Sequence, residues 1–244
     1  MVGGSNERND ATTDPFVWAP TRGFHAIGTN GEAYAINDHG QVTGTSGNYQ
    51  VAFLWTKTDG AVSLGTLGGS GSLGYAIDRR GQVVGYSFTG PTFYHAFLWT
   101  KTTGMEDLGT LGGDNSFATG ISDRGKVVGW AHVTGSAAYH AFLSTKDDTM
   151  HDLGTLGGTN SLSLAVNNHG QIVGSSALNG DTSIHAFLWT AMVGMQDLNS
   201  LIPPNSGWEL SWSAAINDSG QIVGNGIING QTHGFLLTPT TLHH

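Results

Sequence analysis

The chain has 244 residues, 38 of them Gly, with 11% charged residues, no Cys and a formal net charge of −9 at pH 7. The nine Lys and Arg residues are spread along the chain, with only Arg79 and Arg80 adjacent, which argues against DNA, RNA or an anionic membrane surface as a partner. No apolar run approaches the roughly 18 residues needed to cross a bilayer. Without cysteine there are no disulfides, thiolate metal sites or cysteine nucleophiles. Many glycines with few charges favour an all-β fold of short strands and tight turns.

The two ends of the chain are predicted to lie outside the fold. Residues 1–14 are polar, contain no apolar stretch that could serve as a signal core, and are expected to be a disordered or added N-terminus. Residues 15–238 are expected to form a single domain, because the repeats described below leave no linker at which to divide it. Residues 239–244 are a tail in which His243 and His244 resemble the remnant of a tag.

Two strands are predicted before the first full repeat. Phe16-Val17-Trp18 matches a Phe-Leu-Trp piece that recurs later, but nothing in the sequence assigns it a neighbouring strand. Residues 24–29 have the pattern of a recurring Leu-Gly-Thr strand, which the last repeat lacks. Because closing a ring of sheets removes exposed edges, we expect residues 24–29 to complete the last sheet.

Three sequence blocks then recur in fixed order. The first is His-Ala-Phe-Leu, often followed by Trp-Thr, at 95–100, 140–143 and 185–190. The second is Asp-Leu-Gly-Thr-Leu-Gly-Gly, at 107–113 and 152–158 and, beginning with Ser63, at 63–69. The third is of the type Ile-Asn-Asp-x-Gly-Gln-Val-Val-Gly, at 36–44, 77–85, 121–129, 166–174 and 216–224. What every repeat shares is usually what each needs to pack, so these blocks indicate architecture more than activity.

The repeat at residues 105–145 is predicted to hold four strands, at 105–111, 118–122, 126–131 and 140–145, with a loop at 112–116. Its turn, residues 122–125, has hairpin chemistry: a short polar side chain opens it and Gly125 takes the positive φ of its last position. The equivalent glycines of the five repeats lie 41, 44, 45 and 50 residues apart. That is the length of a four-stranded propeller blade, so we expect a five-bladed β-propeller. A β-solenoid is the alternative, although its rungs usually repeat at shorter spacing.

The fifth repeat has one enlarged loop. From the last Leu of the second block to the Ile of the next strand there are ten positions in three repeats (67–77, 111–121 and 156–166) but fifteen from Leu201 to Ile216. The candidate ligand-binding residues are Asn205, Trp208, Glu209 and Trp212 in this segment, and Trp130 in the third repeat. Aromatic faces beside carboxylate and amide groups are what a sugar site uses. Alternatively, the loop caps the fold and buries its tryptophans.

The recurring histidines, His95, His140, His185 and His233, allow two interpretations. They line equivalent ligand pockets, or each imidazole bonds a neighbouring backbone carbonyl as part of the scaffold. Because a whole repeat separates them, they are not expected to converge on a zinc ion.

Matching turn positions hold Asp38, Asp123, Asn168 and Asp218, an oxygen-rich set that could hold Ca²⁺ in a central channel. Arg79 takes that position in the second repeat and opposes a cation there, and such side chains also have a local role in a turn. We therefore expect no cofactor.

Together the three blocks resemble the HAF repeat family of extracellular bacterial repeat proteins over residues 24–237. Departures are Val51 at the first His position, Ser144 in place of Trp, and Leu-Asn-Ser-Leu at 198–201 in place of Leu-Gly-Thr-Leu. The resemblance implies an extracellular or secreted repeat module and supplies no established activity.

Three functions remain open. The first is a non-catalytic, lectin-like propeller that recognises carbohydrate, in which several similar repeats raise avidity. The second is a glycoside hydrolase, which needs two carboxylates about 5 to 10 Å apart and for which Glu209 would be one. The third is a purely structural or protein-interaction module. The expected partner is a glycan, with other surface proteins as an alternative.

Overall fold

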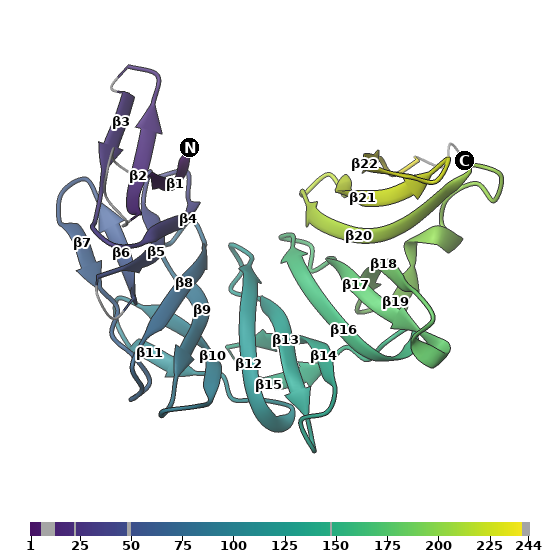
Figure 1. The fold of residues 1–244 in the computed structure, drawn as a ribbon, viewed down its shortest axis with the longest axis horizontal. Coiled ribbons are helices and arrows are strands. Elements are labelled where there is room, and N and C mark those ends of the chain that lie inside the picture. Colours follow the sequence, from purple (N-terminus) through teal and green to yellow (C-terminus); the bar gives the residue numbers. More distant parts are fainter. Residues whose placement is uncertain (6–12, 22, 48–49, 147, 241–244) are drawn as a thin grey trace. The chain divides into compact units, whose positions relative to one another are not determined.

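The computed structural model describes residues 1–5, 13–21, 23–47, 50–146 and 148–240. In these residues the regular structure consists of β-strands and two short 3-10 turns, η1 (Asn179–Asp181) and η2 (Leu198–Ser200). The strands form six small antiparallel sheets (Figure 1). The predicted all-β class is confirmed. No helix in the described part of the chain is long and apolar enough to span a membrane.

The chain divides into two compact units, and each is described by itself. Unit 1 comprises Met1–Thr110 and Asp114–Asp123, and unit 2 comprises Leu111–Gly113 and Arg124–His244. Unit 1 holds the sheets β1-β2-β3, β4-β5-β6-β7 and β11-β10-β9-β8. Their strands are β1 (Val2–Ser5), β2 (Asp14–Ala19), β3 (Gly23–Ala26), β4 (Glu32–Ile36), β5 (Val42–Ser46), β6 (Val51–Thr56), β7 (Gly60–Ser63), β8 (Ser72–Ile77), β9 (Val83–Phe88), β10 (Tyr94–Thr100) and β11 (Gly104–Asp107).

The remaining sheets are β12-β13-β14-β15, β16-β17-β18-β19 and β20-β21-β22. Their strands are β12 (Gly112–Ile121), β13 (Val127–Val133), β14 (Tyr139–Thr145), β15 (Asp148–Asp152), β16 (Gly157–Val166), β17 (Ile172–Leu178), β18 (Ile184–Thr190), β19 (Gly194–Asp197), β20 (Trp208–Ile216), β21 (Ile222–Ile228) and β22 (Gln231–Leu237). In each full repeat the third sequence block spans the turn between the first two strands and the His-Ala-Phe block forms the third strand.

The predicted hairpin turns are confirmed. Asn37 Oδ1 accepts hydrogen bonds from the N–H groups of His39 and Gln41, each at 3.0 Å, and Asn167 makes the same pair of bonds in unit 2. These bonds favour the turn over a continued strand. The Gly that ends each of the five turns has φ between 72° and 78°, where an L side chain is strained.

A second repeated glycine is required by close backbone approach. The first strand of a repeat bulges opposite it, as between Gly74 and Ala76 of β8, which face Gly85 and Val84 of β9. A Cβ on Gly85 would overlap the carbonyl oxygen of Leu73. The equivalent glycines meet the same kind of obstacle: Gly44, Gly174 and Gly224. The last Gly of the third block is therefore set by packing.

The His-Ala-Phe strand is buried on both faces of its sheet. In β10 the consecutive residues Ala96 and Phe97 point to opposite faces, and neither has exposed surface. Ala52 of β6 packs in one cluster with Phe97 of the following sheet. In unit 2, Ala141 likewise packs with Phe187. Within each unit, neighbouring sheets therefore stack with the Ala face of one on the Phe face of the next.

A serine ties neighbouring sheets together beside these cores. The N–H of Ala52 donates to Ser72 Oγ at 2.9 Å, and this hydroxyl donates to the carbonyl oxygen of Gly65 at 2.6 Å. The same N–H···Oγ bond joins Ala96 to Ser116 and Ala141 to Ser161. Buried backbone groups between the sheets are thereby satisfied.

The structure has six sheets where five are predicted. The additional one is formed by β1, β2 and β3, and Phe16-Val17-Trp18, which the sequence leaves unplaced, lies in its central strand. The pairing of Gly3 with Phe16 repeats that of Gly85 with Phe97. Val2–Ser5 is thus a strand of the repeated pattern, within the range predicted to lie outside the fold. The predicted tail beyond residue 240, like residues 6–12, lies outside the described residues.

The prediction that residues 24–29 complete the last sheet is wrong. β3 pairs with β2, in the register Phe16↔Ala26 and Trp18↔Phe24. The last sheet has three strands in the described residues. The physical reason is local: β2 ends at Ala19 and β3 begins at Gly23, so these consecutive strands pair at little entropic cost of loop closure.

The predicted loop at 112–116 is also wrong, because these residues belong to β12. Gly112 has φ 97°, and a Cβ on Gly113 would lie 2.5 Å from the carbonyl oxygen of Val133. The glycines permit a close crossing of backbones within a strand, although their composition is typical of a loop.

Candidate functional site

The candidate residues of the enlarged loop do not share one site. Trp208, Glu209 and Trp212 lie on β20, and Asn205 is exposed in the turn before it. A register shift between Leu210 and Trp212 separates the two tryptophans along the strand. They line different pockets as a result.

Trp208 lines an apolar pocket of about 330 Å³, here called the Trp208 pocket. Its walls are Ile202, Pro203, Ser206, Trp208, Leu210 and Gly234–Leu237. The indole ring lies 6.5 Å from the rings of both His233 and Phe235, and it packs against the core of the last sheet. This environment favours a packing role for Trp208.

Glu209 belongs to a chain of ionisable groups. Its Oε1 lies 3.8 Å from Nε2 of His185, whose Nδ1 lies 2.6 Å from Asp197 Oδ2. His185 thus stands between two carboxylates, and Glu209 is exposed at the outer end.

Trp212 lines a pocket of about 260 Å³ in unit 2, here called the Trp212 pocket. It lies over β16, β17 and β18, and its lining is more polar than that of the Trp208 pocket. The lining residues are Tyr139, Asn160, Ser161, Leu162, Ser175, Ser176, Ala177, Asp181, Ile184 and Trp212. The pocket therefore combines two aromatic rings with hydroxyl, amide and carboxylate groups.

Several of these polar groups are held in place by the backbone. Asn160 Oδ1 accepts from the Tyr139 N–H at 3.0 Å. The Asp181 carboxylate accepts from the N–H and the hydroxyl of Thr159, both at 2.8 Å. The backbone bond from Thr159, followed by the hydroxyl bond, lowers the pKa of Asp181 below its ordinary value. At neutral pH the rim of the pocket thus carries a positioned negative charge.

The Trp212 pocket lies where the fourth repeat has small residues at positions that are aromatic in the second and third repeats. Three positions on the second and third strands of a repeat line this region, and strand pairing shows that they correspond. In repeats two, three and four, the first position holds Tyr86, Trp130 and Ser175. The second position holds Phe88, His132 and Ala177, and the third holds Tyr94, Tyr139 and Ile184.

In the second repeat the aromatic rings contact one another. The ring centroid of Tyr86 lies 5.0 Å from that of Tyr94 and 5.2 Å from that of Phe117. Phe117 corresponds to Trp212, since each lies four residues before the Ile that ends its strand. Because Ser175 replaces the Tyr86 ring, the fourth repeat leaves space that reaches Trp212.

Unit 1 holds a related pocket of about 220 Å³, here called the Tyr86 pocket. Its lining residues are Thr45, Gln50, Ser70, Gly71, Ser72, Leu73, Tyr86 and Phe88. Tyr86 and Phe88 form its wall at the positions that Ser175 and Ala177 hold in the Trp212 pocket. Equivalent hollows thus occur in both units, but only the Trp212 pocket extends across the central strand to a tryptophan.

Trp130 lies beside the Trp212 pocket. Its ring centroid is 5.5 Å from that of Tyr139, which lines the pocket, and 5.7 Å from that of His132. Among the predicted site residues, Trp212 lines this pocket, Trp130 contacts a residue that lines it, and Trp208 lines a different pocket. Ser175, Ala177 and Asp181 were not singled out from the sequence, although comparing the repeats position by position reveals the first two.

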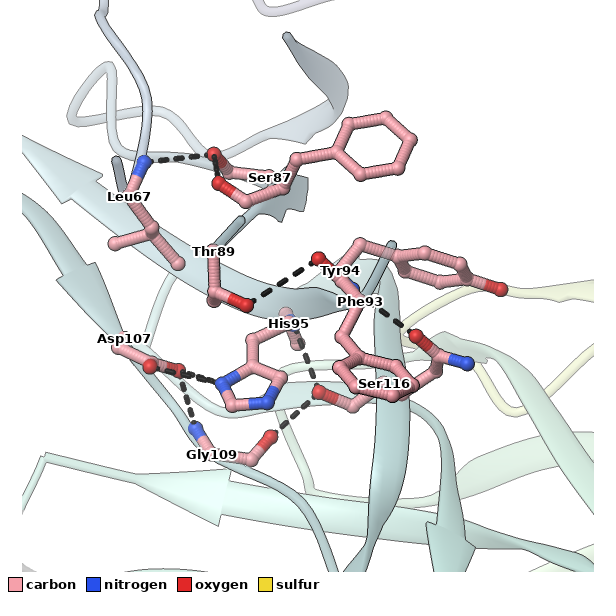
Figure 2. A network of polar contacts seen from close by, with 12 residues as sticks. Leu67, Ser87, Thr89, Phe93, Tyr94, His95, Asp107, Gly109 and Ser116 are labelled. Atoms are coloured by element: carbon pink, nitrogen blue, oxygen red, sulfur yellow. Dashed lines mark hydrogen bonds and ion pairs between the residues drawn. The ribbon is translucent and has the colours of Figure 1, made fainter. Parts of the chain in front are cut away.

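Three of the four recurring histidines, His95, His140 and His185, bond carboxylates, and the predicted backbone carbonyl partner is wrong for them. His95 Nδ1 donates to the Asp107 carboxylate at 2.8 Å, and Asp107 Oδ1 also accepts from the Gly109 N–H at 2.7 Å (Figure 2). His140–Asp152 and His185–Asp197 repeat the pair. The first repeat lacks both partners at once, having Val51 and Ser63. The His of the first block and the Asp of the second therefore act as one structural element.

The turn carboxylates also bond within the protein. Asp123 Oδ1 accepts from the Arg79 N–H at 2.9 Å, and Asp218 accepts from the N–H and side-chain amide of Asn168, both at 2.9 Å. The backbone bond from Asn168, then the amide bond, lowers the pKa of Asp218. Among the described residues, no group of three or more His, Asp and Glu side chains is arranged to hold a metal ion.

Comparisons with known proteins give little further information. No protein-family model matches the chain, and no curated protein matches it. Among solved structures, it is similar to a gluconolactonase from Xanthomonas campestris, with 9% identity, a TM-score of 0.48, and coverage of 93% of this chain and 79% of the other. A similarity of that size carries no argument about activity.

Proposed function

We propose that this chain is a non-catalytic carbohydrate-binding protein and that the Trp212 pocket is its principal site. The observation that carries the proposal is that Ser175, Ala177 and Ile184 replace, beside Trp212, the residues that are aromatic in the second and third repeats. This replacement occurs in a repeat whose scaffold residues are otherwise retained. The scaffold accepts either kind of residue, since the first and fifth repeats have Thr45 and Asn225 at the position of Ser175. In the fourth repeat the small residues lie beside Trp212, and a ligand site benefits from the space.

The pocket's chemistry suits a sugar. An indole face packs against the apolar face of a pyranose ring, and oxygen and amide groups bind its hydroxyls. Trp212 supplies the aromatic face, while Asn160 and Asp181 supply polar groups along one wall. The pocket, at about 260 Å³, is slightly smaller than common ligand sites, which suits a single sugar ring.

The proposal includes the setting of the protein. We assign the chain to the HAF repeat family on its three sequence blocks, with the six sheets as propeller blades and an extracellular or secreted location. The related Tyr86 pocket offers a second, smaller site, and two weak sites on one chain raise avidity for a glycan with repeated units. The proposed function involves neither nucleic-acid binding nor membrane insertion.

A glycan array tests the proposal with two matched variants. Trp212→Ala and Trp208→Ala make the same change on the same strand, but only the first removes a wall of the Trp212 pocket. The proposal predicts a glycan signal that Trp212→Ala abolishes and Trp208→Ala retains. A blank array, or loss with Trp208→Ala alone, contradicts it.

The same preparation separates the alternative functions. Release of reducing sugar from an array hit, abolished by Glu209→Gln, indicates a hydrolase and overturns the non-catalytic assignment. Binding without release supports the proposal. A blank array combined with capture of a purified surface protein favours a protein-interaction module.

A further inference from the structure

One group that lines the Trp212 pocket is charged at neutral pH, the carboxylate of Asp181. Its Oδ1 accepts a hydrogen bond from the Thr159 N–H, and its Oδ2 accepts one from the Thr159 hydroxyl, both at 2.8 Å. A carboxylate has about four lone-pair sites, so about two of them stay available to a ligand. The pocket therefore presents a negative group that is fixed in direction and can accept further hydrogen bonds.

The hydroxyl donors on the same side of the pocket are used within the protein. The hydroxyl groups of Ser161 and Ser176 donate to backbone carbonyl oxygens. The side-chain amide of Asn160 donates to Thr159 Oγ1 at 3.2 Å, and that hydroxyl gives its own proton to Asp181. This side of the pocket consequently favours a ligand that supplies the hydrogen-bond donors.

The placement of the acid differs between the third and fourth repeats. Asp181 bonds to Thr159, and the corresponding positions of the third repeat hold Ser136 and Asp114. Ser136 and Asp181 share a left-handed backbone, with φ of 54° and 52°. Both repeats thus have an acid and a hydroxyl residue at these two positions, but in exchanged order. In the fourth repeat it is the Asp181 position that lines the pocket, so this order brings the charge to the ligand.

The part of the sequence that builds the pocket is acidic. Residues 147–244 include seven Asp and Glu residues and no Lys or Arg. All of the pocket's lining except Tyr139 comes from this stretch. A ligand carboxylate would therefore lie near Asp181 without a positive partner in the lining, whereas a ligand cation would be paired.

We propose, on the basis of the function proposed above, that the Trp212 pocket selects sugars with a free amino group and disfavours acidic sugars. The ammonium group of a 2-amino-2-deoxyhexose has three donors and no acceptor, which matches the Asp181 carboxylate. The apolar face of the same ring packs against Trp212. N-acetylation removes the positive charge and therefore the preference.

Matched sets of methyl hexosides test the preference. Each of the gluco, galacto and manno configurations is prepared as the neutral sugar, the 2-amino sugar, the N-acetylated sugar and the uronic acid, and the whole chain is titrated by ligand-observed NMR. In the configuration that binds, the amino sugar should bind about five-fold more tightly than the neutral sugar, since Asp181 is exposed and an exposed ion pair contributes modestly. The N-acetylated sugar should show no such gain, and the uronic acid should bind more weakly than the neutral sugar.

Two variants with the same chemical change locate the preference. Asp181→Asn should bring the affinity ratio of amino to neutral sugar close to one. Asp218→Asn should retain the ratio, because Asp218 is likewise exposed and bonded by the N–H and side chain of a single residue, Asn168, but does not line the pocket. Raising the salt concentration from about 0.05 M to about 1 M should reduce the ratio in the parent chain, since salt screens exposed charges.

The outcomes separate this inference from the function on which it rests. Failure of every sugar to bind overturns both. Binding of neutral sugars that Trp212→Ala abolishes, without a preference for the amino sugar, overturns the charge selection alone. So does an amino-sugar preference that persists unchanged in Asp181→Asn.

Discussion

The second and fourth repeats have the same strand pairing but differ in the side chains at equivalent positions. In the second repeat Gly85 faces a bulged first strand, and Gly174 does the same in the fourth repeat. The residue that follows this Gly pairs with Ala96 in the second repeat and with Ala186 in the fourth. That residue is Tyr86 in one repeat and Ser175 in the other. The first belongs to an aromatic cluster, and the second lines an open pocket beside Trp212. One set of positions thus maintains the scaffold, and another decides whether a repeat carries a site.

The largest effects should come from what the two repeats share. Phe97→Ala and Phe187→Ala each remove a fully buried ring from equivalent cores and leave a cavity. Each should lower the free energy of unfolding by about 3–5 kcal/mol. Urea denaturation of the two variants measures the change. A difference of more than a factor of two between them would show that the cores are not equivalent.

The next effect concerns the cluster that the fourth repeat lacks. Tyr86→Ser removes the ring contacts with Phe88, Tyr94 and Phe117. It should lower the free energy of unfolding by about 2 kcal/mol, because partly buried aromatic area and edge contacts are lost. Thermal melting measures it, with Tyr86→Phe as a control that keeps the ring. If Tyr86→Ser melts with the parent chain, the cluster is not a stabilising element.

The serine bonds should contribute similarly in both regions. Ser116→Ala and Ser161→Ala each leave a buried N–H and a carbonyl oxygen without their hydroxyl partner. We expect losses of about 1–3 kcal/mol for each, since unsatisfied buried polar groups carry a desolvation penalty. Ser→Cys and Ser→Thr variants at both sites check whether the loss follows the hydroxyl. Neutral Ala variants would contradict a bridging role for the serine.

The smallest effect should be a change in acid sensitivity at the Trp212 pocket. The folded-state pKa of Asp181 is lowered by its bonds from Thr159, so its contribution is present above the unfolded pKa and is lost as pH falls through the folded pKa. Asp181→Asn should therefore reduce the loss of stability between neutral pH and about pH 3. Urea midpoints at several pH values measure it, and Thr159→Val, which removes one of the two donors, should be intermediate. An unchanged pH profile in Asp181→Asn would refute the assignment.

Repetition made the scaffold predictable. The turn chemistry at Gly40 and its equivalents and the all-β class follow from local rules applied several times. Four strands per sheet was right in number but wrong in grouping, because the strand predicted at 105–111 is β11 (Gly104–Asp107), which pairs with β10 of the preceding sheet. The strand pairing of residues 24–29 could not be predicted in this way. β3 pairs with β2, and β2 matches the repeated sequence blocks only weakly. The strand at Gly112–Ser116 was missed because glycines needed for close crossing have the composition of a loop.

The candidate site was predicted only in part. The enlarged loop led to the prediction that Trp208 and Trp212 belong to one site. The register shift of β20 between Leu210 and Trp212 instead places them in different pockets. The Trp212 pocket depends on residues that are absent, namely the aromatic rings replaced by Ser175 and Ala177. Such a signal is visible only when repeats are compared at equivalent positions. The His–Asp pairs were missed for a related reason, since their partners lie in different sequence blocks.

The most direct test exchanges the one residue that distinguishes the two regions. Ser175→Tyr places the side chain of Tyr86 at the equivalent position, where the backbone already accommodates it, and closes the space that leads to Trp212. Isothermal titration with a glycan that the parent chain binds should show binding reduced at least about ten-fold, with an unchanged melting temperature. A variant that binds the glycan as tightly as the parent chain would contradict the Trp212 pocket as the binding site.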